Sequence, residues 1–226
     1  MLEEKKIMKN EIRITLPFYK IVYPFLFLIF LAIFRGIADT KEIGVTLDPM
    51  MAALSIVFMS DTYLIENREQ MWEIFALYAL NKKKTMVYKR VLVQFVYLFL
   101  LAAIGYFLFF VQNPTRGVWG TEVKMYLEYL FAVSITILFW GSMTIIGANF
   151  FRNIWCGIGI SLIIWLILNS TFGSNVFGKY NIFSYAFRSY EQGTGVGWIP
   201  GKVIGVILVI LMMFGLLPQT IKTRRN

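Results

Sequence analysis

Residues 91–111, VLVQFVYLFLLAAIGYFLFFV, form an apolar run without a charged side chain. Because a helix of roughly 20 apolar residues crosses a hydrocarbon core about 30 Å thick, this run predicts a transmembrane helix. Gln94 lies inside the run, where an amide without a partner is costly, so we expect it to hydrogen-bond a neighbouring helix.

The composition extends this prediction to the whole chain. Hydrophobic residues make up 58% of the 226 residues and charged residues 15%, with a mean hydropathy of +0.65. Soluble domains of this length are much less apolar. We therefore expect an all-α polytopic membrane protein, with residues 1–226 in a single transmembrane domain. The net charge of +9 does not indicate nucleic-acid binding, because no basic stretch belongs to a soluble module.

Further apolar runs lie on both sides of residues 91–111. Residues 1–17 place their basic side chains largely opposite their apolar ones on a helical wheel, which predicts a helix in the membrane interface. Residues 173–200 are rich in Phe and Tyr but interrupted by Gly and Ser, so they do not form a regular span. The six predicted spans cover residues 19–38, 47–65, 91–111, 125–151, 154–172 and 201–217.

The distribution of basic residues predicts the orientation. Six spans place both termini on one side of the membrane, together with residues 66–90 between the second and third spans. This side carries 15 of the 22 Lys and Arg residues. Because Lys and Arg gather on the cytoplasmic side, we expect both termini and residues 66–90 in the cytoplasm, and residues 173–200 outside.

The sequence lacks the residues that common enzyme sites need. It has no histidine and a single cysteine, Cys156. Ser-His-Asp triads, His-containing metal sites and internal disulfides are therefore excluded. Residues 193–203, GTGVGWIPGKV, look like a phosphate loop, but Val196 replaces its first Gly and Val203 replaces its Mg²⁺-binding hydroxyl. We expect neither catalysis nor a bound metal or cofactor in this chain.

Polar residues inside predicted spans are candidates for functional or structural contacts. Asp61 lies near the cytoplasmic end of the second span, where Lys89 or Arg90 at the start of the third span can pair with it. We expect a structural ion pair there rather than a proton-carrying carboxylate. Asn149 and Asn169 are expected to form hydrogen bonds between helices.

Two further features concern helix ends and helix packing. Arg35, near the outer end of the first span, is expected to reach the interface or to meet Asp39 or Glu42. The spacing of Gly201 and Gly205 in the sixth span permits close approach of another helix.

Residues 66–80 predict an amphipathic cytoplasmic helix. Aromatic residues recur there at three- and four-residue spacing, which gives the helix an apolar stripe, and acids precede and flank them. An exposed stripe of this kind usually contacts a lipid interface or another protein. The residues concerned are Glu66, Glu69, Trp72, Glu73, Phe75 and Tyr78.

Together these features resemble the permease subunit of type 2 ATP-binding-cassette exporters, which has an N-terminal elbow helix and six spans. The resemblance covers essentially the whole chain. In that family the linker between the second and third spans often reads E-R-E-x-G-T-L-E, followed by aliphatic residues and a Lys. Residues 66–73 read ENREQMWE, with Gln70 and Met71 where Gly-Thr is common, and Lys89 precedes the third span.

The resemblance implies a permease that works as a pair, with a second copy or with a related chain. Two cytoplasmic ATPase subunits, which bind ATP and Mg²⁺, would dock on a coupling helix at residues 66–80. Residues 173–200 would form an extracytoplasmic re-entrant helical hairpin. The expected location is a prokaryotic plasma membrane, with lipid around the spans. The expected cargo is amphipathic or apolar, such as an antimicrobial peptide or a drug.

Two alternative functions remain open. An ATPase-independent scaffold or sensor would use the stripe around Trp72 to bind a regulator, and a secondary carrier would use Asp61. Co-isolation of an ATPase favours the exporter, whereas ATP-independent transport that needs Asp61 favours the carrier.

Overall fold

The structure is a computed structural model that describes residues 11–64, 78–112, 114, 119–187 and 197–223. This part of the chain forms helices and turns, with no β-strand. In chain order the helices are α2 (Phe18–Phe34), α3 (Thr40–Met59), α6 (Leu80–Val111), α7 (Trp119–Phe151), α8 (Ile154–Leu168), α9 (Thr171–Phe177), the 3-10 turn η1 (Gly178–Tyr180), α10 (Ile199–Ile210), the π-helical η3 (Leu211–Leu216) and α11 (Leu217–Thr223).

Several of these helices are suited to a membrane. Within the described residues, α3, α6, α7 and the continuous helix from α10 to Ile221 are long and apolar enough to cross it. A fifth span results if α8 and the segment Thr171–Tyr180, which are bent by 70° at Asn169 and Ser170, count as one. The shorter α2 is also apolar. The chain is therefore an all-helical protein with four or five helices of membrane-spanning character, and six spans remain a prediction.

Two helices begin earlier than hydropathy predicts, whereas α8 begins at residue 154 as the predicted fifth span does. Where we expected spans to begin at residues 47 and 125, α3 begins at Thr40 and α7 at Trp119. Asp39 caps α3 by accepting a hydrogen bond from the Lys41 N–H at 3.0 Å. Helix α3 therefore begins before the apolar stretch that hydropathy detects, at the residue that follows its polar cap.

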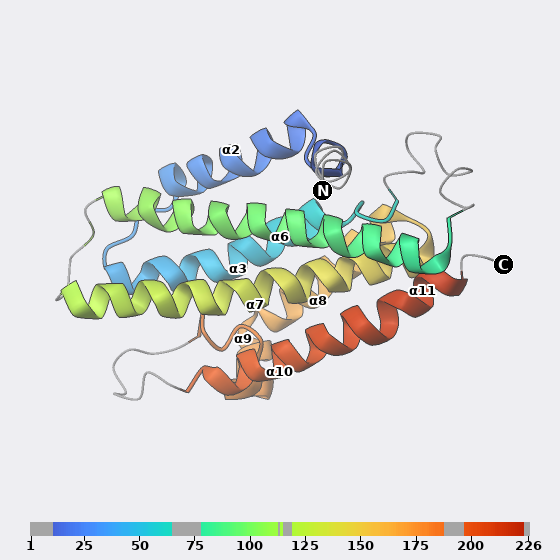
Figure 1. The fold of residues 1–226 in the computed structure, drawn as a ribbon. Helices are drawn as coiled ribbons and strands as arrows, with labels where there is room; N and C mark the ends of the chain where they lie inside the picture. The colour runs from blue at the N-terminus through green and yellow to red at the C-terminus, as the bar shows by residue number, and fades with distance from the viewer. Residues whose placement is uncertain (1–10, 65–77, 113, 115–118, 188–196, 224–226) are drawn as a thin grey trace.

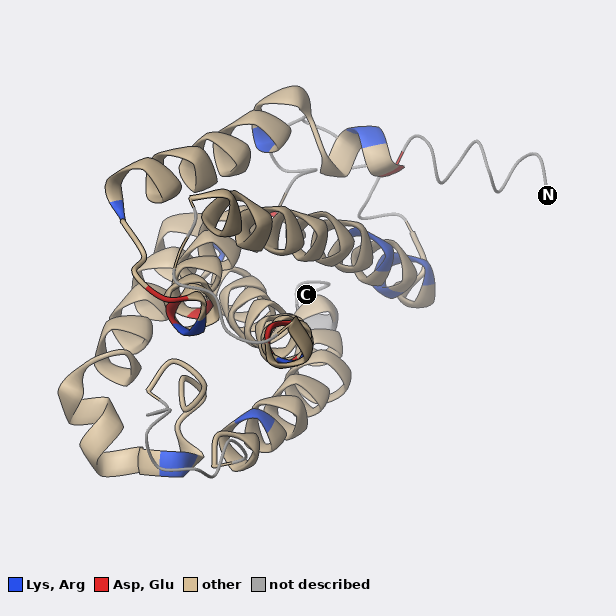
Figure 2. Ribbon diagram, turned by 90° about the vertical axis from the view of Figure 1, so that its left-hand side faces the viewer, with Lys and Arg blue, Asp and Glu red and all other residues tan. Residues whose placement is uncertain are grey.

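Successive long helices run antiparallel, so their connections fall at two opposite ends of the molecule (Figure 1). The end of α3, the start of α6, the α7–α8 turn and α11 share one end, and α11 packs against both α6 and α7 there. The α2–α3 connection and the starts of α7 and α10 lie toward the other end. Figure 2 looks along the helices and shows charged residues as short bands on a largely uncharged ribbon, grouped most closely at the start of α6.

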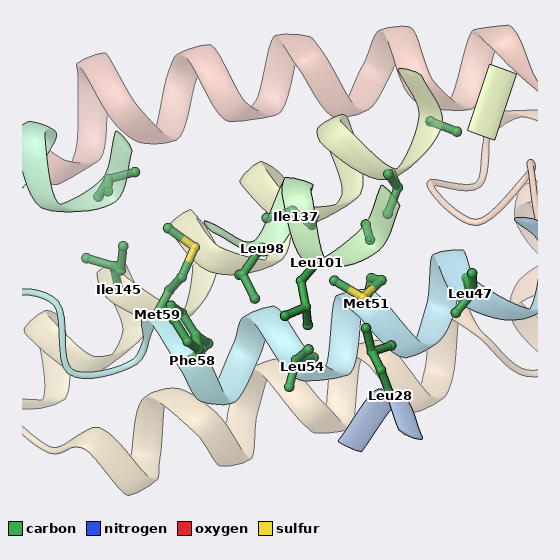
Figure 3. Close-up of a cluster of buried hydrophobic side chains, with 14 of the residues drawn as sticks. Leu28, Leu47, Met51, Leu54, Phe58, Met59, Leu98, Leu101, Ile137 and Ile145 are labelled. Atoms are coloured by element: carbon green, nitrogen blue, oxygen red, sulfur yellow. The ribbon is translucent and has the colours of Figure 1, made fainter. Parts of the chain in front are cut away.

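Helix α3 is the centre of the bundle. It packs against α6, α7 and α8, and its most extensive contact is with α7. Because neighbours surround it, α3 buries residues on every side, as a helix enclosed by others does. Figure 3 shows part of this core, in which Leu54 and Phe58 of α3 lie near Leu98 and Leu101 of α6.

Helices α7 and α8 form a tight hairpin. Arg152 turns the chain with a φ of 55°, and Asn153 caps α8 by accepting the Trp155 N–H at 2.9 Å. Gly157 then lies against the backbone of α7, where an added Cβ would be 2.6 Å from the Ala148 nitrogen. The missing side chain thus lets the two helices approach each other closely.

The N-terminal helices lie outside this bundle. Residues 11–15 are helical and the helix ends before Pro17, whereas the rest of the predicted interfacial helix lies outside the described residues. Helix α2 buries few residues and contacts mainly α6. Polar side chains tie it to α6, because Tyr97 donates to the Ile21 carbonyl at 2.7 Å and the Gln112 amide donates to the Ala32 carbonyl.

The hairpin packing gives a matched pair of substitutions. Gly157→Ala is expected to lower the free energy of unfolding by about 1–3 kcal/mol, because its methyl group would overlap the α7 backbone. Gly159→Ala has open space around its Cβ and is expected to be neutral or stabilising by up to about 1 kcal/mol. Titration with SDS in detergent micelles, followed by circular dichroism, measures both. Equal effects would contradict the packing.

Candidate functional site

The most deeply buried charges in the described residues lie where α3, α7 and α10 meet. Lys202 Nζ is 2.8 Å from Asp48 Oδ2, and neither side chain has any exposed surface. The Thr136 hydroxyl completes the cluster: it donates to Asp48 Oδ1 at 2.6 Å and accepts from Lys202 Nζ at 2.6 Å. Both carboxylate oxygens thus have a hydrogen-bond donor, and the cluster has no net charge.

The helix geometry explains how the three residues come together. Asp48 lies eight residues after Thr40, about 12 Å along α3, and Thr136 lies near the middle of α7. Lys202 lies in the first turn of α10, between Gly201 and Gly205 on the buried face.

These two glycines let α10 approach its neighbours. An added Cβ at Gly201 would collide with the Asn181 carbonyl oxygen, and one at Gly205 would be 2.9 Å from Ile135 Cγ2 of α7. The close approach brings the Lys202 side chain within reach of α3.

Aromatic side chains border the charged cluster. Lys202 Nζ lies 6.0 Å from the centroid of the Tyr185 ring. Tyr185 and Tyr129 both contact α3 at Gly44, one turn before Asp48, where an added Cβ would be 2.5 Å from the Tyr185 hydroxyl and 3.1 Å from Tyr129 Cβ. The ammonium is therefore held by a carboxylate, a hydroxyl and an aromatic ring, which together form a favourable site for a cation.

Buried ion pairs also hold the N-terminal part of the chain. Lys20 of α2 forms an ion pair with Asp61, donates to the Phe58 carbonyl at 3.2 Å, and lies 5.3 Å from the Phe58 ring centroid. Arg90 of α6 donates to a Glu11 carboxylate oxygen at 2.9 Å. The sequence suggested Lys89 or Arg90 for Asp61, so Lys20 is a partner that sequence reasoning missed.

The other predicted polar residues occupy different environments. Gln94 is buried and accepts a hydrogen bond from the Thr62 hydroxyl at 2.6 Å, while its Nε2 has no partner. Asn149 is buried with neither side-chain polar atom hydrogen-bonded. Asn169 ends α8 at the 70° bend, and Arg35 is exposed at the end of α2. These residues do not converge on one site.

The predicted coupling helix falls almost wholly outside the described residues. Glu66, Glu69, Trp72, Glu73 and Phe75 are not described. Tyr78, at the start of α6, is half-buried, and the Lys82 ammonium lies 4.1 Å from its ring centroid. In the sequence, residues 66–77 lie between the end of α3 and the start of α6.

Sequence reasoning did not single out Asp48 or Lys202. Each is the second residue of a predicted span, and Lys202 was counted among the seven basic residues on the outer face of the membrane. The signal that could have found them is a pair of opposite charges at the outer ends of two apolar runs. An unpaired charge there is costly, so a partner on a neighbouring helix is expected.

Comparisons with protein-family models, curated proteins and solved structures found no match to this chain.

The buried cluster predicts a strong coupling between two charges. Asp48→Leu or Lys202→Met alone leaves an uncompensated buried charge and is expected to lower the free energy of unfolding by about 3–5 kcal/mol. The double substitution Asp48→Leu with Lys202→Met removes both charges and is expected to be less damaging than either single change.

A matched control is Lys124→Met, because the Lys124 side chain is 75% exposed. Its effect is expected to stay within about 0.5 kcal/mol. SDS titration of the four proteins measures all these changes. A double variant as unstable as the sum of the two singles would show that Asp48 and Lys202 do not interact.

Proposed function

We propose that this chain is the membrane-spanning subunit of an ATP-driven exporter that receives mechanical work from separate cytoplasmic ATPase subunits. The observation that best supports the proposal is the gathering of the end of α3, the start of α6, the α7–α8 turn and α11 at one end of the bundle. The basic residues at the start of α6 (Lys82, Lys83, Lys84, Lys89 and Arg90) belong to this end, which favours a cytoplasmic position for it.

The shape of α6 supports a role in transmitting motion. It is continuous from Leu80 to Val111, 32 residues, and is thus about 48 Å long. The connection that precedes it contains the proposed coupling helix. A force on this connection would therefore reach one end of a rigid helix that extends through the whole bundle.

A hydrogen bond links α6 to the last helix. The Tyr88 hydroxyl donates to the Met213 carbonyl at 2.6 Å, and the Tyr88 ring stacks on Phe214 with centroids 6.1 Å apart. Met213 lies in the π-helical segment η3, and such segments are frequent at functional sites in helices. Because α10 continues directly into η3, displacement of α6 would be passed on to α10, the helix that carries Lys202.

The energy for this motion would come from ATPases that bind two states of the transporter with different affinities. The proposed assembly contains two such permease chains, identical or related, and two ATPase subunits. The proposed cargo is amphipathic or apolar, either a peptide or a drug. A secondary carrier based on Asp61 is less favoured, because Lys20 already neutralises that carboxylate.

The proposal predicts that residues 66–80 bind the ATPase. In a chain co-expressed with an ATPase encoded beside it, Trp72→Ala, Glu73→Ala and Phe75→Ala together are expected to weaken the complex at least about tenfold, because aromatic anchors dominate such interfaces. The yield of co-purified ATPase and the ATPase activity of the reconstituted complex measure the loss.

A matched triple variant at the opposite end provides the control. This control removes one Phe, one Glu and one Trp, as the test variant does, through Phe34→Ala, Glu42→Ala and Trp119→Ala. All three positions are exposed and lie at the opposite end of the bundle, at the end of α2 and the starts of α3 and α7. This variant should retain the ATPase. An undiminished complex after the changes at residues 72, 73 and 75 would rule out the coupling helix.

A further inference from the structure

The cluster around Lys202 has the composition of a binding site for an organic ammonium ion. Lys202 Nζ contacts a carboxylate oxygen of Asp48 at 2.8 Å and the Thr136 hydroxyl at 2.6 Å, beside the Tyr185 ring. We propose that this cluster binds the ammonium group of a cationic amphipathic substrate, and that Lys202 occupies the place of that group in the conformation described here.

A stripe of residues on α7 connects the cluster with the outer end of that helix. Glu122, Tyr126, Tyr129, Val133 and Thr136 follow each other at alternating four- and three-residue intervals, so they share one face of α7. This face begins in the first turn of the helix with an acid and ends at the charged cluster.

Aromatic rings continue between these two ends. The Tyr126 and Tyr106 ring centroids are 4.9 Å apart, and those of Tyr106 and Tyr129 are 5.3 Å apart. Tyr129 and Tyr185 then meet at Gly44, as described above. Tyr106 and Tyr129 are buried in this conformation, so their ring faces, which attract cations, become contacts for an organic cation when the helices separate.

Glu122 supplies an independent indication of a ligand. Glu122 is 7% exposed, and its Oε1 atom is buried without a hydrogen-bond partner. A buried carboxylate oxygen that lacks a donor is costly, which makes the position attractive to a cation that brings its own donors. The stripe therefore has an acid at each end, of which the inner one is occupied by Lys202.

The packing of α10 provides a way for Lys202 to leave. The buried residues of α10 are Gly201, Lys202 and Gly205, so Lys202 is the one long side chain of this helix that is buried, while Leu208 and Val209 are partly buried against the core. A shift of α10 away from α3 would withdraw the ammonium and expose Asp48.

As a statement about exported cargo this inference rests on the proposed function, whereas the binding site itself can be tested on the chain alone.

The test uses the full chain in lipid nanodiscs without any ATPase, so its outcome is independent of ATPase docking. The probe is dansylcadaverine, a fluorescent primary alkylammonium, and its neutral N-acetyl derivative is the control for partition into lipid. Wild type is expected to bind the ammonium probe weakly and saturably, because Lys202 competes for Asp48. Lys202→Ala should bind it at least about tenfold more tightly, since the competing group is gone.

Two further variants identify the acids. Adding Asp48→Asn to Lys202→Ala should abolish the gain in affinity, and Glu122→Gln in the otherwise intact chain should weaken probe binding about threefold or more. Equal binding by wild type and Lys202→Ala, an unchanged gain without Asp48, or equal binding of the acetylated probe would overturn the proposal.

Glu122→Gln also keeps the test decisive if Lys202→Ala does not fold, because this variant leaves the Asp48–Lys202 pair intact. In that case wild type is measured at raised probe concentration. Saturable, ammonium-dependent binding that Glu122→Gln weakens would support the site. The lack of such binding, or its insensitivity to Glu122→Gln, would overturn it.

Discussion

The ion pair between Asp48 and Lys202 is the constraint on which the arrangement of α3, α7 and α10 depends. Neither charge can be left without a partner in the interior, because the cost of an isolated buried ion exceeds what local packing can offset. The pair therefore keeps α10 against α3, and Thr136 fixes α7 in the same contact. Apolar packing alone would not specify this arrangement, since lipid chains solvate an apolar helix surface as well as another helix does.

The same reasoning connects the interior with the basic end of the bundle. Lys20 and Arg90 bring charges of α2 and α6 into buried pairs with Asp61 and Glu11, so the N-terminal region is also held by polar contacts. Tyr88 then joins α6 to the π-helical part of the last helix. A continuous series of contacts thus extends from the first half of α6 to the helix that carries Lys202. In the proposed exporter, this series would couple movement at the cytoplasmic end to release of the Asp48 carboxylate.

The sequence predicted the class of the fold because apolar runs of membrane length leave few alternatives to helices. It predicted the start of α8 at residue 154 but not the start of α3, because hydropathy measures the polarity of side chains, whereas Asp39 determines where α3 begins through a backbone hydrogen bond. It missed the Asp48–Lys202 pair, because the two residues are 154 positions apart and only the folded bundle brings them together. The predicted docking residues such as Trp72 lie outside the described residues and remain a prediction.

Solid-state NMR of the chain in bilayers would test the Asp48–Lys202 pair most directly. With ¹⁵N at Lys Nζ and ¹³C at Asp Cγ, rotational-echo double resonance reports the separation of the two nuclei. Since Nζ lies 2.8 Å from Asp48 Oδ2, we predict an N–C separation of about 3–4 Å for this pair. Lys20 and Asp61 contribute a second signal, so the comparison is with Lys202→Arg, which keeps the positive charge but carries no lysine label. A short-distance component that disappears in Lys202→Arg is the predicted result. Identical dephasing curves for the two proteins would contradict the buried pair, and with it the arrangement of α10 and the ammonium site.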